Sequence, residues 1–177
     1  FGTALAHFGV GVMVIGIVAT SAYRVEQIVL MKPGDTARIA GYLVTFEGTS
    51  TRPGPNYTEL VGRFGVATSD GPVAQLEGAK RRYRVPRQTT TEAGILASPF
   101  GDLYVVLGDE AAGGGEQVSV KPYAIQLYFN PLVRLIWGGA LIMALGGLLS
   151  LTDRRLRIGA PRRARQSVTA RPAQPAE

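Results

Sequence analysis

Residues 1–23 read FGTALAHFGVGVMVIGIVATSAY, and residues 135–152 read LIWGGALIMALGGLLSLT. Neither stretch contains a charged residue, and a helix needs roughly 20 mostly apolar residues to span a membrane. The Arg-rich sequence DRRLR directly follows the second stretch, which disfavours a helix buried in a water-soluble core. The pattern therefore predicts a membrane protein with two transmembrane helices, at residues 1–23 and 131–152.

The first stretch differs from a secretory signal peptide, although it ends in the small residues Ala19 to Ala22. A signal peptide begins with a methionine and a basic region, and neither precedes this apolar run. We therefore expect the sequence to be the C-terminal piece of a longer membrane protein, in which Phe1 is an internal residue.

The distribution of charge predicts the orientation of the helices. The chain has a net charge of +6, and residues 153–177 contribute +5 of it through seven Arg against Asp153 and Glu177. Arg residues close to a membrane helix favour the cytoplasmic side. We therefore expect a bacterial inner membrane protein, with a disordered cytoplasmic tail at 153–177 and residues 24–130 in the periplasm. The tail Arg residues could also touch lipid headgroups.

Residues 24–130 consist of short β-branched and aromatic runs separated by turn residues, with no helical period of convincing length. This pattern predicts an all-β sandwich or small barrel. The expected strands are Arg24–Met31, Ala37–Phe46, Tyr57–Thr68, Val73–Glu77, Lys80–Val85, Asp102–Leu107 and Gln117–Phe129. We expect a Gly- and Pro-rich loop at Gly48–Asn56 and a flexible loop at Gly108–Glu116.

The composition excludes several kinds of site. The chain has no Cys, which rules out disulfides, thiolate metal sites and covalent haem attachment to this chain. One His cannot build a multi-His metal centre or a Ser–His pair in the β domain, because it lies at position 7. Gly113–Gly115 lacks the strand, helix and Lys of a phosphate loop. We therefore assign no catalytic residue to this chain, and the basic tail alone does not indicate nucleic-acid binding.

His7 is the candidate cofactor- and metal-binding residue. An imidazole within hydrocarbon is costly unless it is hydrogen-bonded or ligated, and neutral imidazole is a common axial ligand of haem iron. The small residues Ala4, Ala6, Gly9 and Gly11 leave room for a flat macrocycle or a neighbouring helix. Sixteen residues separate His7 from Tyr23, which places His7 about 24 Å deeper, in the inner half of the bilayer. An interhelical hydrogen bond or a headgroup contact remains the alternative.

The basic run Lys80–Arg87 and the glycine pairs of the second helix are two further features. Lys80, Arg82 and Arg84 should share one strand face, and Arg81 and Tyr83 the other. Such a run can bind haem propionates, lipid phosphates or an acidic partner, but it more often protects an exposed edge strand. Gly138–Gly139 and Gly146–Gly147 predict close helix packing within a larger bundle.

Six motifs follow one another along the chain: His7-Phe-Gly-Val-Gly; Arg24-Val-Glu with Met31-Lys-Pro-Gly-Asp35; Thr90-Thr-Glu-Ala93; Gly101-Asp-Leu-Tyr-Val-Val-Leu-Gly108; Lys121-Pro-Tyr with Asn130-Pro-Leu-Val and Ile136-Trp-Gly-Gly; and Gly146-Gly with Asp153-Arg-Arg. In this order they resemble the C-terminal part of the CcmF family, the large membrane subunit of the bacterial cytochrome c haem lyase. The resemblance extends to about Ile158.

The resemblance implies a role in cytochrome c maturation. Members of the family take haem from the chaperone CcmE and apocytochrome c from CcmH and CcmI, and they join the haem vinyl groups to the CXXCH thiols. They also hold a haem b between two His on different membrane helices. His7 matches one of these ligands, which implies that His7 is an axial ligand of haem b and that the second ligand lies outside this chain.

The Trp-rich haem-handling domain and two periplasmic haem-binding His of the family have no counterpart in this sequence. The resemblance therefore implies a part of a haem lyase that is not active alone. Two alternatives stay open from the residues themselves. The chain could be a non-catalytic, membrane-anchored scaffold whose β domain docks periplasmic partners, or a channel or transporter subunit that uses His7 as a polar pathway residue.

Overall fold

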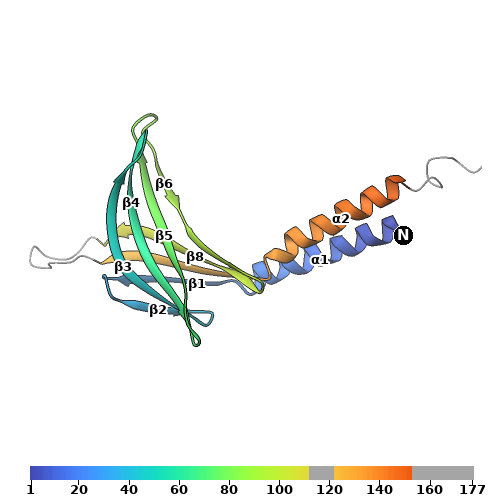
Figure 1. The fold of residues 1–177 in the computed structure, drawn as a ribbon, viewed down its shortest axis with the longest axis horizontal. Coiled ribbons are helices and arrows are strands. Elements are labelled where there is room, and N and C mark those ends of the chain that lie inside the picture. Colours follow the sequence, from blue (N-terminus) through green and yellow to red (C-terminus); the bar gives the residue numbers. More distant parts are fainter. Residues whose placement is uncertain (112–121, 153–177) are drawn as a thin grey trace, which may run out of the picture.

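The computed structural model describes residues 1–111 and 122–152 (Figure 1). Within them, the helices are α1 (Gly2–Ala22) and α2 (Arg134–Thr152), and all the strands lie between the two. The strands are β1 (Val25–Met31), β2 (Thr36–Ile39), β3 (Tyr42–Pro53), β4 (Tyr57–Thr68), β5 (Gly71–Tyr83), β6 (Thr89–Glu92), β7 (Gly94–Ser98), β8 (Gly101–Glu110) and β9 (Tyr123–Pro131). The predicted tail at 153–177 and the Gly113–Gly115 linker lie outside the described residues.

The strands form two antiparallel sheets that pack face to face. Their orders are β1-β9-β8-β7 and β2-β3-β4-β5-β6. The side chains between the sheets include Phe46 and Phe64, whose rings lie 5.3 Å apart, and both are fully buried together with Leu103 and Ile125. The all-β fold class is confirmed, and the two separate sheets make the domain a sandwich and not a closed barrel.

Strand β8 shows how the sequence produces this packing. Leu103, Val105 and Leu107 are fully buried, whereas the intervening Tyr104 and Val106 are half-buried on the outer face. Successive side chains of a strand point to opposite faces, so the first three face the core. The outer residues are also largely apolar, which explains why Leu103–Leu107 is a continuous apolar run in the sequence and not an alternating one.

The expected strand bounds are wrong in several places. Gly48–Asn56 is not a loop, because β3 continues to Pro53, which pairs with Thr58 of β4. Val73–Glu77 and Lys80–Val85 belong to the single strand β5 up to Tyr83. Conversely, the turn at Ala40–Gly41 divides Ala37–Phe46 into β2 and β3. Strands β6 and β7 were not expected, and β8 extends to Glu110, into the predicted loop at Gly108–Glu116.

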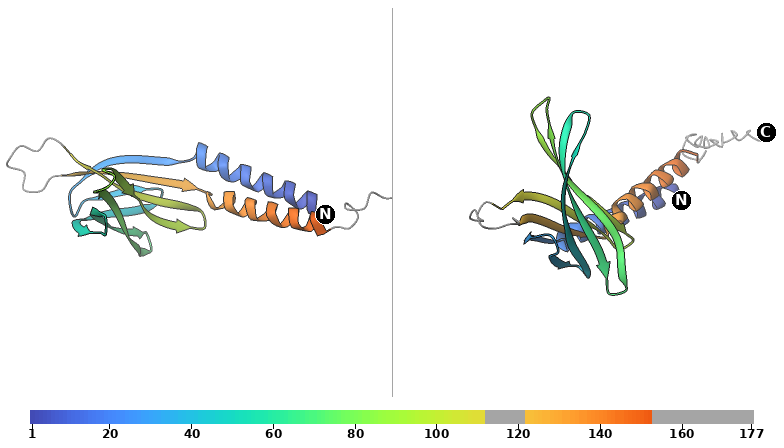
Figure 2. Two further views of the ribbon diagram at one scale, coloured as in Figure 1. Left: turned by 90° about the horizontal axis from the view of Figure 1, so that it is seen from above. Right: turned by 60° about the vertical axis from the view of Figure 1, so that its left-hand side comes forward.

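The two helices lie side by side and antiparallel (Figures 1 and 2). Both are long and apolar enough to cross a membrane. Buried glycines line their contact: Gly2, Gly9 and Gly16 on α1, and Gly139 and Gly146 on α2. Most of their large apolar side chains are exposed instead, including Phe8, Ile15, Leu141 and Leu148. Such an exposed apolar surface suits lipid or further membrane helices rather than water.

The helix pair leaves one end of the sandwich (Figure 1). Tyr23 and Arg24 alone connect α1 to β1, and Leu132 and Val133 alone connect β9 to α2. Leu132 adopts a left-handed φ of 53°, and its backbone N–H donates a hydrogen bond to the Phe100 carbonyl at 2.9 Å. The Thr20 hydroxyl donates to the Pro131 carbonyl at 3.1 Å. The first contact ties the connection between β9 and α2 to the turn between β7 and β8, and the second ties the end of α1 to the end of β9.

Candidate functional site

His7 lies in the N-terminal third of α1, on the face that points away from α2. An α-helix turns by about 100° per residue, so His7 lies roughly 140° around the helix from Gly2 and 160° from Gly9. Both glycines are buried against α2, whereas His7 is exposed. A partner for His7 must therefore approach from outside this helix pair.

The imidazole of His7 is oriented by its own helix. Its Nδ1 lies 2.8 Å from the carbonyl oxygen of Thr3, one turn earlier. A carbonyl oxygen only accepts hydrogen bonds, so Nδ1 must carry the proton of this bond. The lone pair of the neutral ring then resides on Nε2, because the hydrogen bond made by one ring nitrogen sets the role of the other. This tautomer leaves Nε2 ready to bind a metal.

The surface around His7 is open on two sides along the helix. Ala4 and Gly11 lie one turn before and one turn after it on the same face. A Cβ added at Gly11 would have no neighbour within 4 Å. The other small residues do not share this face: Gly9 and Ala6 pack against the backbone of α2 at Gly139 and Gly146. Of the two uses expected for these small residues, Ala6 and Gly9 serve the close approach of a neighbouring helix, and Ala4 and Gly11 lie on the face of His7.

The donor set limits what His7 can bind by itself. Among residues 1–111 and 122–152, no group of three or more His, Cys, Asp or Glu side chains could hold a metal ion. A neutral imidazole on an open, apolar helix face does fit one axial position of a haem, which needs one nitrogen donor and flat, uncharged surroundings. A second axial ligand of such a haem would have to come from another segment.

Glu59, on the outer face of the five-stranded sheet, is the centre of an ion-pair network that the sequence analysis missed. Its carboxylate accepts hydrogen bonds from Nε of Arg52 on β3 at 2.6 Å and from Nε of Arg81 on β5 at 2.9 Å. The pKa of Glu59 is lowered by the hydrogen bond from Arg81 and then by that from Arg52. The three residues lie on three different strands, so no local sequence pattern marks this network.

The predicted basic run Lys80–Arg87 is divided by the fold. Lys80 forms an ion pair with Asp109, and Arg81 pairs with Glu59 and, at 3.3 Å, with Glu92. Strand β5 lies between β4 and β6, so the interpretation of this run as an edge strand is wrong. Arg82, Arg84 and Arg87 remain exposed at the end of the β5–β6 hairpin.

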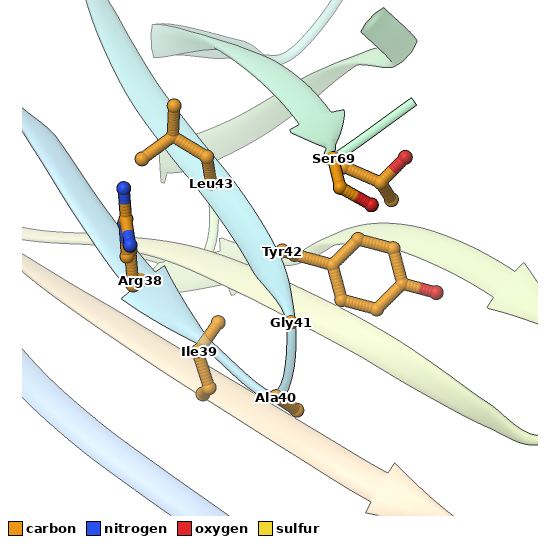
Figure 3. Close-up of a pocket in the computed structure, with 8 residues that line it drawn as sticks. Arg38, Ile39, Ala40, Gly41, Tyr42, Leu43 and Ser69 are labelled. Carbon is orange, nitrogen blue, oxygen red and sulfur yellow. The ribbon is translucent and has the colours of Figure 1, made fainter. Parts of the chain in front are cut away.

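A cavity of about 360 Å³ lies by the turn between β2 and β3 (Figure 3). Arg38, Tyr42, Thr68 and Ser69 supply its polar side chains, and the rest of the lining comes from the turn between β2 and β3. In Figure 3 the side chains of Arg38 and Tyr42 point in different directions and do not converge. Nothing in this cavity pairs an acid, a base or a nucleophile as catalysis requires.

Comparison with known proteins agrees with this architecture. The family described as CcmF C-terminal beta-sandwich matches residues 22–131. The cytochrome c-type biogenesis protein CycK of Rhizobium meliloti (strain 1021) is 45% identical over 168 residues, which is 95% of this chain and 24% of the relative. The cytochrome c-type biogenesis protein CcmF of Pseudomonas aeruginosa is 39% identical over 168 residues, again 95% of this chain and 24% of the relative.

A solved structure, that of the cytochrome c heme lyase CcmF, has the same fold with a TM-score of 0.66 and 20% sequence identity. It covers 85% of this chain, and this chain covers 24% of it. The chain thus spans about a quarter of the length of the relatives that it matches. The family match over the whole sandwich, together with these relatives, shows that the chain belongs to the CcmF family and carries its C-terminal β-sandwich.

Proposed function

We propose that this chain is the C-terminal portion of a cytochrome c maturation haem lyase subunit, in the complex that attaches haem covalently to apocytochrome c. In this proposal it supplies His7 as one axial ligand of a membrane haem b, together with a periplasmic β domain. Family membership supports the role in cytochrome c biogenesis. The relatives that align with 95% of this chain are cytochrome c-type biogenesis proteins.

The observation that carries the His7 assignment is the hydrogen bond between its Nδ1 and the Thr3 carbonyl, at 2.8 Å. This bond leaves Nε2 as the nitrogen available to a ligand, and His7 is an exposed residue on the helix face opposite the glycines that contact α2. A bound haem b supplies a redox-active iron that can accept and pass on an electron. His7 would hold the iron through Nε2, the Thr3 carbonyl would keep the ring in the binding tautomer, and the small residue Gly11 would leave space for a macrocycle.

The depth of His7 favours a role in electron supply or in structure over direct haem attachment. The α1 end at Ala22 adjoins the β domain, and His7 lies fifteen residues before it, about 23 Å along the helix. Haem b at His7 is therefore remote from the membrane surface at which the β domain lies. The thioether bonds to apocytochrome c form at that surface in this proposal.

The partners follow from the same assignment. The β domain lies in the periplasm, where the haem chaperone CcmE and the apocytochrome-handling subunits CcmH and CcmI bring haem and apocytochrome c. The two helices cross the inner membrane, contact lipids and the upstream helices of the full-length subunit, and leave the C-terminal tail in the cytoplasm. The proposal includes no nucleic-acid partner.

Replacing His7 tests the ligand assignment. In the full-length protein, His7→Ala should remove the haem b or its low-spin spectrum, and cytochrome c maturation should fall with it. His7→Cys and His7→Met should retain part of the haem, because each offers an axial donor. Added imidazole should restore part of both. The measurement is the reduced-minus-oxidised spectrum of the purified protein, with the protein amount determined by immunoblot.

Val14→Ala is the matched control. Val14 is exposed two turns further along the same face of α1 and offers no donor atom. Its replacement should leave the spectrum unchanged. Full haem content and an unaltered spectrum in His7→Ala would make His7 a packing residue and would favour the scaffold alternative.

A further inference from the structure

Three arginines at one end of the sandwich have no partner within the described part of the chain. Arg82, Arg84 and Arg87 are exposed, and none of their side chains forms an ion pair or hydrogen bond with residues 1–111 or 122–152. By contrast, their neighbours Lys80 and Arg81 are both neutralised by carboxylates. We call Arg82, Arg84 and Arg87 the arginine tip.

The backbone beneath the arginine tip is fixed by the adjacent β3–β4 hairpin. The side-chain Nδ2 of Asn56 donates to the Val85 carbonyl at 2.8 Å, and the backbone N–H of Arg84 donates to the Asn56 carbonyl at 3.0 Å. The backbone N–H of Tyr83 also donates to the Gln88 carbonyl at 2.8 Å. The two hairpin ends thus hold each other, which reduces the entropy lost when a ligand binds.

The arginine tip also lines a concave surface. A cavity of about 590 Å³ is bordered by all three arginines together with Tyr83, Gln88 and Thr89. Tyr83 is half-buried, with its ring 5.3 Å from that of Tyr57. The three guanidinium groups and the Gln88 amide offer several hydrogen-bond donors for carboxylates, and the Tyr83 ring offers an apolar surface.

Edge protection does not explain these charges. The last pair of the β5–β6 ladder joins Arg82 to Thr89, so Arg84 and Arg87 lie beyond the ladder, in the connection between the strands. There is no open strand edge at these two positions for them to block. Free positive charges on a rigid concave surface instead attract and orient an anionic partner.

The position of the arginine tip selects the kind of partner. In Figures 1 and 2 the β5–β6 hairpin end points away from the helix pair, to the side of the sandwich. Headgroups of the membrane that the helices span are thus far from it. We propose that the arginine tip docks an acidic segment of a partner protein, whose Asp and Glu side chains bind Arg82, Arg84 and Arg87. This inference does not rest on haem ligation by His7.

Site-specific photo-crosslinking in the full-length protein tests the proposal. A p-benzoylphenylalanine at Gln88, within the cavity, should crosslink in native membranes to a protein segment with several Asp or Glu residues. Changing Arg82, Arg84 and Arg87 together to Ser should lower the yield by about tenfold, and raising the salt concentration should lower it as well. The corresponding triple Lys variant should keep most of the yield, because it keeps the charge.

Lys32, Arg38 and Arg63 provide the matched control, since they are also exposed but lie elsewhere on the sandwich. Changing these three to Ser removes the same charge and should leave the crosslink intact. A crosslink to lipid or to a segment without acidic residues, no crosslink, or an unchanged yield in the arginine-tip variant would overturn the proposal. The haem b spectrum of the same membranes is recorded in parallel. A change in crosslinking without a change in this spectrum concerns the arginine tip and not His7.

Discussion

Glu59 is the one charged side chain that is buried in the part of the chain that the structure describes, with 4% of its surface exposed. Burial alone would raise its pKa, but hydrogen bonds from Arg81 and Arg52 outweigh this effect and lower it. Arg81 also lies over the ring of Tyr57, at 5.0 Å from the centroid. Glu59 therefore joins β3, β4 and β5 beneath the arginine tip.

We expect the stability of the sandwich to depend on the ionisation of Glu59. Its pKa in the folded chain is below the ordinary value of 4.5, so its ion pairs stabilise the fold fully above pH 4.5. This contribution is lost as the pH falls further, through the folded-state pKa. Glu59→Gln should abolish this loss of stability at acid pH, because Gln does not ionise. At pH 7 it should lower the melting temperature by about 5 °C.

Thermal unfolding of the whole chain in detergent micelles, followed by circular dichroism at several pH values, measures both effects. Glu26→Gln is the control. Glu26 forms an ion pair with Arg24 at 3.8 Å, but both side chains are about half exposed, and such a surface pair contributes little to stability. An equal change in melting temperature in the two variants would contradict a special role for Glu59.

The sequence indicated His7 and the basic run but not the Glu59 network, and the reason is the range of the contacts. His7 stands out because its neighbours along one helix are apolar, which is a local pattern. Arg52, Glu59 and Arg81 meet only because three strands pair in one register, with Arg52 opposite Glu59 and Glu59 opposite Arg81. No local pattern contains that register.

At the scale of elements, the two helices pack through their glycines. A Cβ added at Gly139 would lie 2.5 Å from the backbone nitrogen of Met13 and 2.6 Å from the carbonyl oxygen of Gly9. At the adjacent Gly138 it would meet nothing within 4 Å. The close approach of the two backbones therefore depends on Gly139, whereas Gly138 faces away from α1.

We predict that Gly139→Leu separates α1 from α2 and that Gly138→Leu does not. Spin labels on Phe1→Cys and Leu151→Cys report the separation, because both positions are exposed and the chain has no other Cys. The distance distribution from electron resonance in micelles should broaden and lengthen only for Gly139→Leu. The same distribution in both glycine variants would show that this contact does not hold the helices together.

The strands show why element bounds were harder to predict than element types. Gly78 reads as a break between two strands, but it pairs with Gly62 in the middle of β5. A Cβ at Gly78 would lie 3.1 Å from the Val105 carbonyl, so a small residue is needed where the two sheets approach. The glycine reflects packing against β8, which only the folded sandwich reveals.

At the scale of the whole molecule, the pairing of β1 with β9 continues into the pairing of α1 with α2. Val25 pairs with Phe129 at the start of the ladder, and a Cβ at Gly16 would lie 2.8 Å from the backbone nitrogen of Ile136. The adjoining ends of both helices are therefore at the sandwich, and their other ends lie together away from it (Figure 1). If both helices cross the membrane, residue 1 and residue 152 emerge on the side opposite the β domain.

The last prediction concerns this arrangement in the cell. The Arg cluster after Thr152 favours the cytoplasmic side, so the β domain should lie in the periplasm. A single cysteine at Ser69, in the exposed turn between β4 and β5, should react with a membrane-impermeant maleimide in intact cells. A single cysteine at Ser167 should react only after the inner membrane is permeabilised. Labelling of Ser167→Cys in intact cells, or protection of Ser69→Cys, would reverse the orientation and remove the β domain from the compartment in which apocytochrome c is handled.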